Sequence, residues 1–546
     1  MYSVRKETTS MYTRDGLRLD ADIYSPESAE KFPVLLMRQP YGRAIASTVV
    51  YAHPMWYASQ GYTVVIQDVR GRGTSQGEFR LFEHEIEDGL DTLNWVSELF
   101  GSKTKVGMYG FSYQGMTQLY TAIHQHPALK TICPSMIAYD LYTDWAYEND
   151  AFCLQANLGW AIQLAAETSR LKGDEIAFQK LYKASRNLPL SELIPAYPNI
   201  LKELALDSFY HDWLTRSSSD EYWKKLSPKY LIQELDIPML HIGGWFDPYL
   251  RGTINLYQEM AQQSHYRQQL IIAPWTHIPW GQKIGAINYG KNAISSIDQL
   301  QINWFDHFLK EKDDQLLEQA PVLLFEMGSH QWINLNGLPK TPTKTYYLSS
   351  KGLASIREDD GKLTEINLPN TTIEDIIVHD PWRPFPALGG HTMYPGGAFE
   401  RSHLDSRSDI LKYTTEPLKA DLQILGQIVV DCYCIADTPS FDLCAILSEV
   451  YPDGKIYNFT QGYIRINSNY RTLPIKIPLQ FTCIKIFKNH CIRLSLSGAC
   501  FPAYPVNTGT GKSPDEERLI EAKIITLKIS SQGGKPSQVI LPLNLS

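Results

Sequence analysis

The sequence lacks the features that mark several specialised classes of protein. No run of lysine and arginine is interleaved with aromatic residues, and the formal charge of −8 is spread along the chain, so nucleic acid is not expected as a partner. No uncharged apolar stretch is long enough to cross a bilayer, and the first ten residues contain no apolar signal core. We therefore expect no membrane partner and a cytoplasmic location.

Patterns for disulfides and metal ligands are missing as well. The eight cysteines are dispersed, and six of them follow residue 430 in sequence typical of strands. Cys432 and Cys434 form a lone C-x-C pair without a second pair at metal-ligand spacing. All eight are expected to be reduced, buried side chains, and neither a metal nor another cofactor is expected.

The composition is that of a soluble globular protein of more than one domain. With 546 residues, 43% hydrophobic and 20% charged, the chain is too long for a single core. Short apolar runs typical of buried parallel strands occur in the first third, and between them apolar residues recur every three or four positions over residues 86–100. This alternation predicts an α/β fold; the runs are residues 34–37, 63–66, 106–109 and 129–133.

Changes of pattern along the chain predict the domain boundaries. After the strand-like runs of the first third, the chain shows helical periodicity without strands. Two more strand-like runs come next, and a long region of strands and turns follows them. We expect a core of residues 1–139 and 233–318, a helical cap of 140–232, and a β sandwich or jelly roll of 319–546. Residues 379–408 form a Pro/Gly/aromatic loop, which is too long for a turn and is expected to reach a site elsewhere.

Residues 105–115 carry the strongest local motif, Lys-Val-Gly-Met-Tyr-Gly-Phe-Ser-Tyr-Gln-Gly. The pattern predicts a strand, a tight turn with Ser112 at its apex, and a helix whose first N–H groups face the same point. The usual elbow is G-x-S-x-G, but Gln114 occupies the place of the second glycine here. An ordinary strand-to-helix turn is therefore the alternative.

Two further strand ends supply the partners that a nucleophilic serine needs. Asp247 follows one predicted strand in Gly-Gly-Trp-Phe-Asp-Pro, and His277 follows the next in Ala-Pro-Trp-Thr-His. The order Ser, Asp, His is that of α/β-hydrolases, in which the imidazole takes the serine proton and the carboxylate orients the imidazole. Asp247 could instead cap a helix, because a proline follows it.

A tetrahedral oxyanion needs two hydrogen-bond donors aimed at one point. The backbone N–H of Tyr113 is the first candidate, because it directly follows Ser112. The second candidate is the hydroxyl of Tyr41, in a loop after an early strand where a lipase-type HGGG motif is absent. The alternative for Tyr41 is packing on Pro40.

The sequence resembles the CocE/NonD family of serine hydrolases, which groups cocaine esterase, α-amino-acid ester hydrolases and Xaa-Pro dipeptidyl-peptidases. The resemblance extends over nearly the whole chain and includes Asp-Val-Arg-Gly-Arg-Gly-Thr-Ser-Gln-Gly at residues 68–77, Gly-Phe-Ser-Tyr-Gln-Gly, Gly-Gly-Trp-Phe-Asp and Pro-Trp-Thr-His. It implies an α/β-hydrolase core, an inserted helical cap and a C-terminal jelly roll, with Ser112, Asp247 and His277 as triad and Tyr41 and Tyr113 as oxyanion hole. Residues 68–77 contain no nucleophile or base and are expected to be structural.

The family resemblance predicts a serine hydrolase that cleaves a small-molecule ester or amide through an acyl-enzyme. Aromatic residues near the triad favour an apolar or aromatic acyl or leaving group, although at least half of them are expected in the core; they are Trp145, Trp245, Phe246, Tyr249 and Trp275. An Xaa-Pro dipeptidyl-peptidase is the alternative, with Glu148 and Asp150 as candidates to hold a substrate ammonium group, and an inert binding protein on a hydrolase fold is another. The sequence sets no oligomeric state and leaves a homo-oligomer open.

Overall fold

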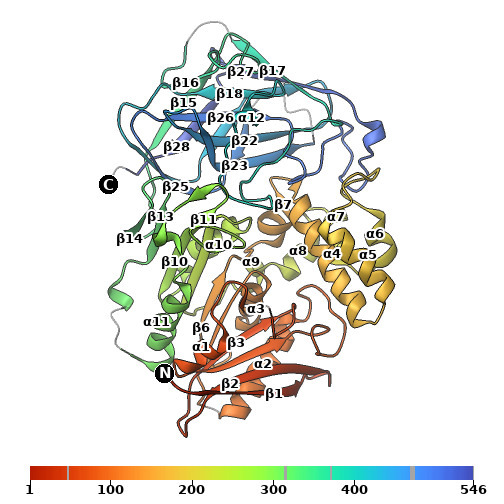
Figure 1. Cartoon of the computed structure of the whole chain (residues 1–546), viewed down its shortest axis with the longest axis vertical. Helices are drawn as coiled ribbons and strands as arrows, with labels where there is room; N and C mark the ends of the chain where they lie inside the picture. Colours follow the sequence, from red (N-terminus) through yellow and green to blue (C-terminus); the bar gives the residue numbers. More distant parts are fainter. Residues whose placement is uncertain (46–47, 102, 313–315, 369–371, 468–473, 545–546) are drawn as a thin grey trace.

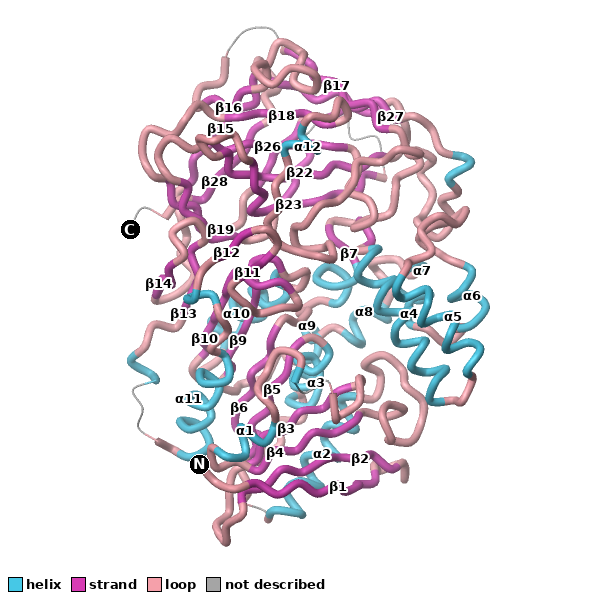
Figure 2. The backbone as a smooth tube through the Cα atoms, in the orientation of Figure 1, coloured by secondary structure: helices cyan, strands magenta, loops and turns pink. Residues whose placement is uncertain are grey.

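The computed structural model describes residues 1–546 except 46–47, 102, 313–315, 369–371, 468–473 and 545–546. An α/β part and a β part lie one above the other along the long axis, and a group of helices flanks the α/β part (Figure 1). Nearly all of the helical segments lie in the lower half, whereas the upper half consists almost entirely of strands and loops (Figure 2). Within the described residues, none of the helices combines the length and apolar character needed to span a bilayer.

A ten-stranded sheet forms the centre of the α/β part. The strands from β4 to β13 run parallel, and antiparallel strands flank them at both edges. The strands in spatial order are β1 (Val4–Tyr12), β2 (Arg18–Pro26), β4 (Thr63–Asp68), β3 (Val34–Gln39), β5 (Val106–Phe111), β6 (Leu129–Ser135), β9 (Met239–Phe246), β10 (Gln268–Thr276), β13 (Val322–Glu326) and β14 (Gln331–Leu335).

Helices cover both faces of this sheet, which explains why its central strands are apolar without alternation. On β3, Leu35 and Met37 belong to one hydrophobic core, and Val34 and Leu36 belong to the core on the opposite face. Gly107 of β5 admits the close approach of a helix, since a Cβ there would lie 2.7 Å from the Phe305 ring. The covering helices are α1 (Pro54–Ser59), α2 (Glu85–Phe100), α3 (Tyr113–Ala122), α10 (Leu250–Gln263) and α11 (Ile297–Lys310).

A helical segment is inserted between β6 and β9. It starts with a π-helical turn, η2 (Tyr142–Ala146), and a two-stranded hairpin, β7 (Tyr147–Glu148) and β8 (Ala151–Phe152). Its helices are α4 (Leu154–Leu171), α5 (Glu175–Arg186), α6 (Asn199–Leu204), α7 (Phe209–Thr215), α8 (Glu221–Leu226) and α9 (Pro228–Leu231).

The β part contains a nine-stranded sheet, a three-stranded sheet and a two-stranded sheet. This architecture and the parallel core confirm the predicted fold class. The strands are β23 (Ile456–Ile466), β22 (Phe441–Val450), β26 (Cys491–Ser497), β18 (Ile410–Thr414), β16 (Lys362–Thr364), β15 (Thr343–Ser349), β28 (Gln538–Pro542), β20 (Val429–Cys432) and β24 (Ile475–Pro478); β17 (Ile373–His379), β27 (Ile525–Ser531) and β21 (Cys434–Ala436); and β19 (Leu422–Gly426) with β25 (Thr482–Ile486).

A buried carboxylate joins the three parts of the molecule. Glu148 lies in the inserted segment and pairs with Arg251 of α10 at 2.9 Å. It also bonds His391 Nε2 at 2.8 Å and accepts the Tyr504 hydroxyl at 2.7 Å, both from the β part. Burial by itself would raise the pKa of Glu148, but Arg251 and His391 hold it well below its usual range.

We expect Glu148→Gln to lower the free energy of unfolding by about 3–5 kcal/mol, because it leaves the buried Arg251 guanidinium without its carboxylate. Thermal and urea unfolding of both proteins measure this loss. The difference should be full above about pH 4.3 and shrink as the pH falls below it, since a depressed carboxyl pKa stabilises the fold only where the unfolded carboxyl is ionised. Glu416→Gln, which removes an exposed partner of Lys362, should change stability by less than about 0.5 kcal/mol.

Candidate active site

A cavity of about 1160 Å³ lies where the core, the helical insertion and the β part meet. The turn after β5, the turns after β9 and β10, and one face of α4 contribute to its wall. A loop of the β part adds His391, Thr392, Met393, Tyr394 and Gly396. This loop lies within residues 379–408, so the prediction that they reach a site elsewhere is confirmed.

Ser112 lies on this wall, at the sharp turn between β5 and α3. Its backbone has φ 60° and ψ −126°, a conformation that costs a non-glycine residue about 1–3 kcal/mol. A Cβ at Gly110 would lie 2.5 Å from the Gln114 Cβ, and one at Gly115 would lie 2.4 Å from the Ile137 side chain. Gly115 therefore makes the close approach to the neighbouring strand, which explains why the motif tolerates Gln114.

Asp247 and His277 lie directly after β9 and β10, which are adjacent and parallel. The His277 Nδ1 and the Asp247 Oδ1 are 2.8 Å apart, and the carboxylate is fully buried. The Tyr249 backbone N–H donates to the Asp247 Oδ2 at 3.2 Å. Burial raises the pKa of Asp247, and the hydrogen bond from His277 opposes this rise.

A residue of the β part that the sequence reasoning missed also holds this turn. The Gln480 Nε2 donates to the Asp247 carbonyl oxygen at 2.7 Å. Gln480 follows β24 and is more than two hundred residues away in the sequence. No local pattern marks it, because only the fold brings the β part to this strand end.

Two aromatic rings flank the His277 imidazole. The Phe111 ring centroid lies 5.3 Å from it, and the Tyr249 ring centroid lies 5.0 Å from it. Phe111 directly precedes Ser112, and Ser112 and His277 line the same cavity. The structure thus brings the serine, the imidazole and the buried carboxylate to one site.

Tyr41 also lines the cavity, next to Pro40. Its hydroxyl oxygen accepts the Trp160 indole N–H at 3.0 Å. This bond uses a lone pair and leaves the phenolic proton available to a ligand in the cavity. Burial raises the pKa of Tyr41 to about 12, against the effects of the Trp160 hydrogen bond and the positive charge of Arg72. Trp160 is a second site residue that the sequence reasoning missed.

Tyr113 is the first residue of α3. Its backbone N–H belongs to the first helical turn, where N–H groups have no acceptor within the helix. Its side chain is buried away from the cavity and donates to the Glu85 carboxylate at 2.7 Å. The backbone of Tyr113, and not its phenol, is therefore the group that can face a ligand.

Three of the five predicted substrate-binding aromatics, Trp145, Phe246 and Tyr249, line the cavity. The structure places the other two in the core, which corrects the prediction for them. The Trp245 indole donates to the Phe325 carbonyl, and the Trp275 indole donates to the Ala293 carbonyl, each at 2.7 Å. The reason is strand alternation, since Trp245 and Phe246 are neighbours on β9 and their side chains point to opposite faces.

The two acidic residues predicted as candidates to hold a substrate ammonium group lie outside the cavity. Glu148 already forms the buried hydrogen bonds and ion pair described above. Asp150 is exposed and accepts a hydrogen bond from the Tyr142 hydroxyl at 3.4 Å. Neither lines the cavity. Among the described residues that line the cavity, the acidic side chain is that of Glu167, which forms two hydrogen bonds with Arg170 at 2.7 and 2.8 Å. Over the part of the chain that the structure describes, no group of three histidine, cysteine or acidic residues is placed to hold a metal ion.

Comparison with known proteins identifies the relatives of the whole chain. Residues 15–279 match the family model of the X-Pro dipeptidyl-peptidases (S15 family), and residues 317–540 match that of the X-Pro dipeptidyl-peptidase C-terminal non-catalytic domain. Cocaine esterase of Rhodococcus sp. (strain MB1 Bresler) is 28% identical over 97% of this chain and 97% of its own. The chain belongs to the CocE/NonD family of serine hydrolases. It is therefore an enzyme, and the inert binding protein considered from the sequence is set aside.

Two solved structures share the fold of the whole chain. An aminopeptidase from the marine sediment archaeon Thaumarchaeota archaeon superposes with a TM-score of 0.83 at 20% identity, covering 100% of this chain and 97% of that one. An α-amino acid ester hydrolase superposes with a TM-score of 0.80 at 20% identity and the same coverage. At this identity the likeness concerns the fold.

Proposed function

We propose that this CocE/NonD enzyme hydrolyses an acyl ester or amide of a small molecule through a covalent acyl-enzyme on Ser112. The observation that carries the proposal is the shared site: Ser112 on a strained turn faces the same cavity as His277, whose Nδ1 is bonded to the buried Asp247. Strained backbone and a carboxylate-bound imidazole are features of nucleophilic sites.

The geometry supports a definite role for each group. With its Nδ1–H bonded to Asp247, His277 offers Nε2 to take the Ser112 proton as the hydroxyl oxygen attacks the substrate carbonyl. The Tyr41 hydroxyl and the Tyr113 N–H then donate to the oxyanion. His277 returns the proton to the leaving alcohol or amine, and water attacks the acyl-enzyme by the same route in reverse.

The lining of the cavity favours an apolar or aromatic substrate group. Trp145 stacks on Trp160 with ring centroids 5.2 Å apart, and the Tyr249 ring centroid lies 4.2 Å from that of Trp145. These rings form a continuous aromatic wall of the cavity that Ser112 also lines. Such walls supply most of the contact area in small-molecule sites. An Xaa-Pro dipeptidyl-peptidase stays the second candidate because both family models carry that description. It is disfavoured because Glu167 is already paired with Arg170.

A side-by-side assay separates the two candidates. Nitrophenyl esters with aromatic acyl groups, aminoacyl esters, aryl amides and Xaa-Pro anilides are compared at equal enzyme concentration. We expect kcat/KM for at least one aromatic acyl ester or amide to exceed that for the Xaa-Pro anilides by tenfold or more. The reverse order, with a further loss in Glu167→Gln, would establish the peptidase instead.

We expect Tyr41→Phe to lower kcat by about 10²–10³-fold with little change in KM, because the lost donor acts on the oxyanion and not on the bound substrate. Trp160→Phe keeps the phenolic donor and serves as the matched control, with a loss below about tenfold. Because the pKa of Tyr41 is raised to about 12, the donor stays protonated and kcat should not fall between about pH 8 and 10. A Tyr41→Phe enzyme with more than half the activity would exclude the role.

We also propose a cytoplasmic location, which the free thiols of all eight cysteines support. Cytosolic proteins keep their thiols reduced, whereas secreted proteins of many cysteines form disulfides. Recovery of the native protein outside the cytoplasm in cell fractionation would contradict this.

A further inference from the structure

Arg72 is a buried cation that has no carboxylate partner among the described residues. Its side chain is 1% exposed, and it forms no salt bridge with any residue that the structure describes. Arg70, two residues earlier in the same motif, pairs with both Asp15 and Asp88. A buried charge is costly when it is left unpaired, so the unpaired arginine calls for an explanation that the paired one does not.

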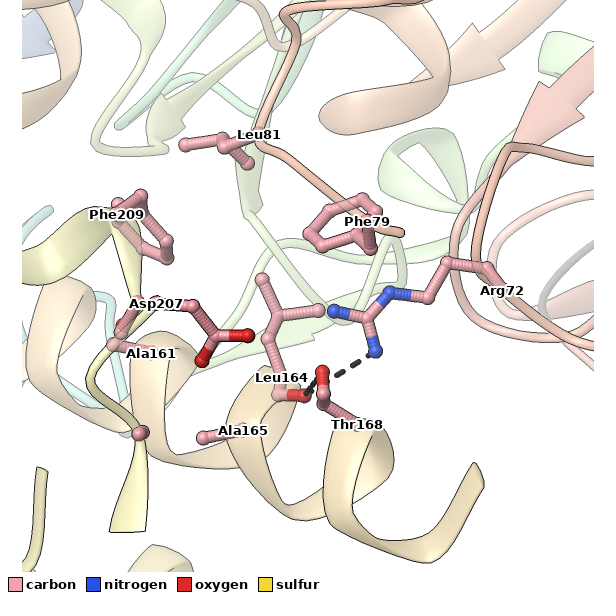
Figure 3. Close-up of a pocket in the computed structure, with 11 residues that line it drawn as sticks. Arg72, Phe79, Leu81, Ala161, Leu164, Ala165, Thr168, Asp207 and Phe209 are labelled. Atoms are coloured by element: carbon pink, nitrogen blue, oxygen red, sulfur yellow. Dashed lines mark hydrogen bonds between the residues drawn. The ribbon is translucent and has the colours of Figure 1, made fainter. Parts of the chain in front are cut away.

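The surroundings of Arg72 hold the guanidinium firmly in place. It lies over the Phe79 ring, 3.8 Å from the ring centroid, and its Nη1 donates to the Leu164 carbonyl of α4 at 3.2 Å (Figure 3). Its Nε has no hydrogen-bond partner among the described residues. Asp207 lies across a cavity of about 30 Å³ and pairs with Lys172 at 3.3 Å. The charge of Arg72 is thus not cancelled at close range.

Helix α4 connects Arg72 to the candidate oxyanion hole. The Leu164 carbonyl oxygen accepts a hydrogen bond from the Arg72 guanidinium. Trp160 lies one turn earlier on the same face of the helix, and its indole N–H donates to the Tyr41 hydroxyl oxygen at 3.0 Å. The charge also acts through space, since it opposes the rise in the pKa of Tyr41 that burial causes. Burial lowers the pKa of Arg72 to about 10, so the guanidinium is charged at neutral pH.

We propose that Arg72 is a positioning residue for hydrolysis, which holds Tyr41 through α4 and Trp160 and lends its unpaired charge to the phenolic donor. A cation near a phenol makes the hydroxyl a stronger donor to a developing oxyanion, and a dry, low-dielectric environment preserves this effect. The inference rests on the proposed function, because it assumes that Tyr41 serves the oxyanion. A purely structural brace would not need an unpaired charge at this place.

The test compares Arg72→Met and Arg72→Lys with the wild type, and Arg70→Met as an arginine whose charge is paired. Active sites are titrated with a fluorophosphonate, so that kcat is expressed per competent site. Phenylboronic acid is the probe of the tetrahedral state, because it forms an anionic adduct with the serine. We expect Arg72→Met to lower kcat and boronate affinity by a similar factor of about 10–30, with KM changed less than twofold.

The variants separate a charge effect from a loss of folding. Arg72→Lys should recover at least a third of the lost activity, and Arg70→Met should lower the melting temperature while leaving kcat per site within twofold. Arg72→Met should cost less than threefold when Tyr41 is already phenylalanine, because the two act in series. Wild-type kcat per site in Arg72→Met, a lysine variant as slow as the methionine variant, or an unchanged boronate affinity would each overturn the inference. If one of these outcomes is found and Tyr41→Phe is nevertheless slow, the proposed function stands and only the role of Arg72 is excluded.

Discussion

Replacing Ser112 by alanine is expected to lower kcat by about 10⁵–10⁶-fold and to abolish labelling by a fluorophosphonate. The imidazole of His277 then has no hydroxyl to activate, and only the oxyanion donors and substrate binding remain to accelerate the reaction with water. The measurement is hydrolysis of an aromatic acyl nitrophenyl ester at saturation, together with mass spectrometry of the labelled protein. KM should stay within a few-fold, because the hydroxyl contributes little to binding.

Ser135→Ala is the matched control. Ser135 is buried at the end of the neighbouring strand, where its hydroxyl bonds the Tyr51 hydroxyl at 2.9 Å, and its loss should leave turnover within threefold. Ser112→Gly should be as inactive as the alanine variant yet no less stable, because glycine adopts a φ of 60° without strain. Label on another residue, or more than 1% of wild-type turnover in Ser112→Ala, would place the nucleophile elsewhere.

The central strands could be predicted from the sequence because both faces of a parallel sheet are buried. The runs at residues 34–37 and 106–109 became β3 and β5, each extended by two residues. The edge pair β1 and β2 gave no such signal. On β2 the buried Leu19, Ala21 and Ile23 alternate with polar residues, so no continuous apolar run marks the strand. The alternate residues Asp20 and Asp22 accept hydrogen bonds from Ser10 and Thr8 of β1.

The site residues that follow a local sequence motif could be predicted, whereas those placed only by tertiary packing could not. The segments that carry Ser112, Asp247 and His277 could be found because each follows a strand with a local motif, although their chemical roles stay predictions. Whether an aromatic residue faces the cavity or the core depends on which side of a strand it occupies, and Trp245 was misplaced for that reason. Trp160 lies on a helix with no motif, and its significance depends on Tyr41, more than a hundred residues away.

Asp247→Asn is expected to lower kcat by about 10⁴-fold while leaving the cavity intact. The reason lies in the two bonds of the carboxylate. The Tyr249 backbone N–H donates to Oδ2, so an asparagine keeps its carbonyl oxygen there and turns its NH₂ group toward the His277 Nδ1. The imidazole must then accept at Nδ1 and carry its proton on Nε2, where it cannot take the proton of Ser112. The defect is therefore one of tautomer, and not of position.

Two measurements distinguish this cause from a loss of folding. Fluorophosphonate labelling of Asp247→Asn should slow in parallel with kcat, and activity should rise with pH over the range in which hydroxide replaces the missing base. Asp375→Asn is the control: this carboxylate is also fully buried and accepts the Tyr413 hydroxyl at 2.7 Å in the β part, so it shares the cost of a buried substitution without contact with the imidazole. If both variants lost activity equally, the effect of Asp247 would be structural. If Asp247→Asn alone lost it and kept its melting temperature, the imidazole would depend on this carboxylate for its proton arrangement.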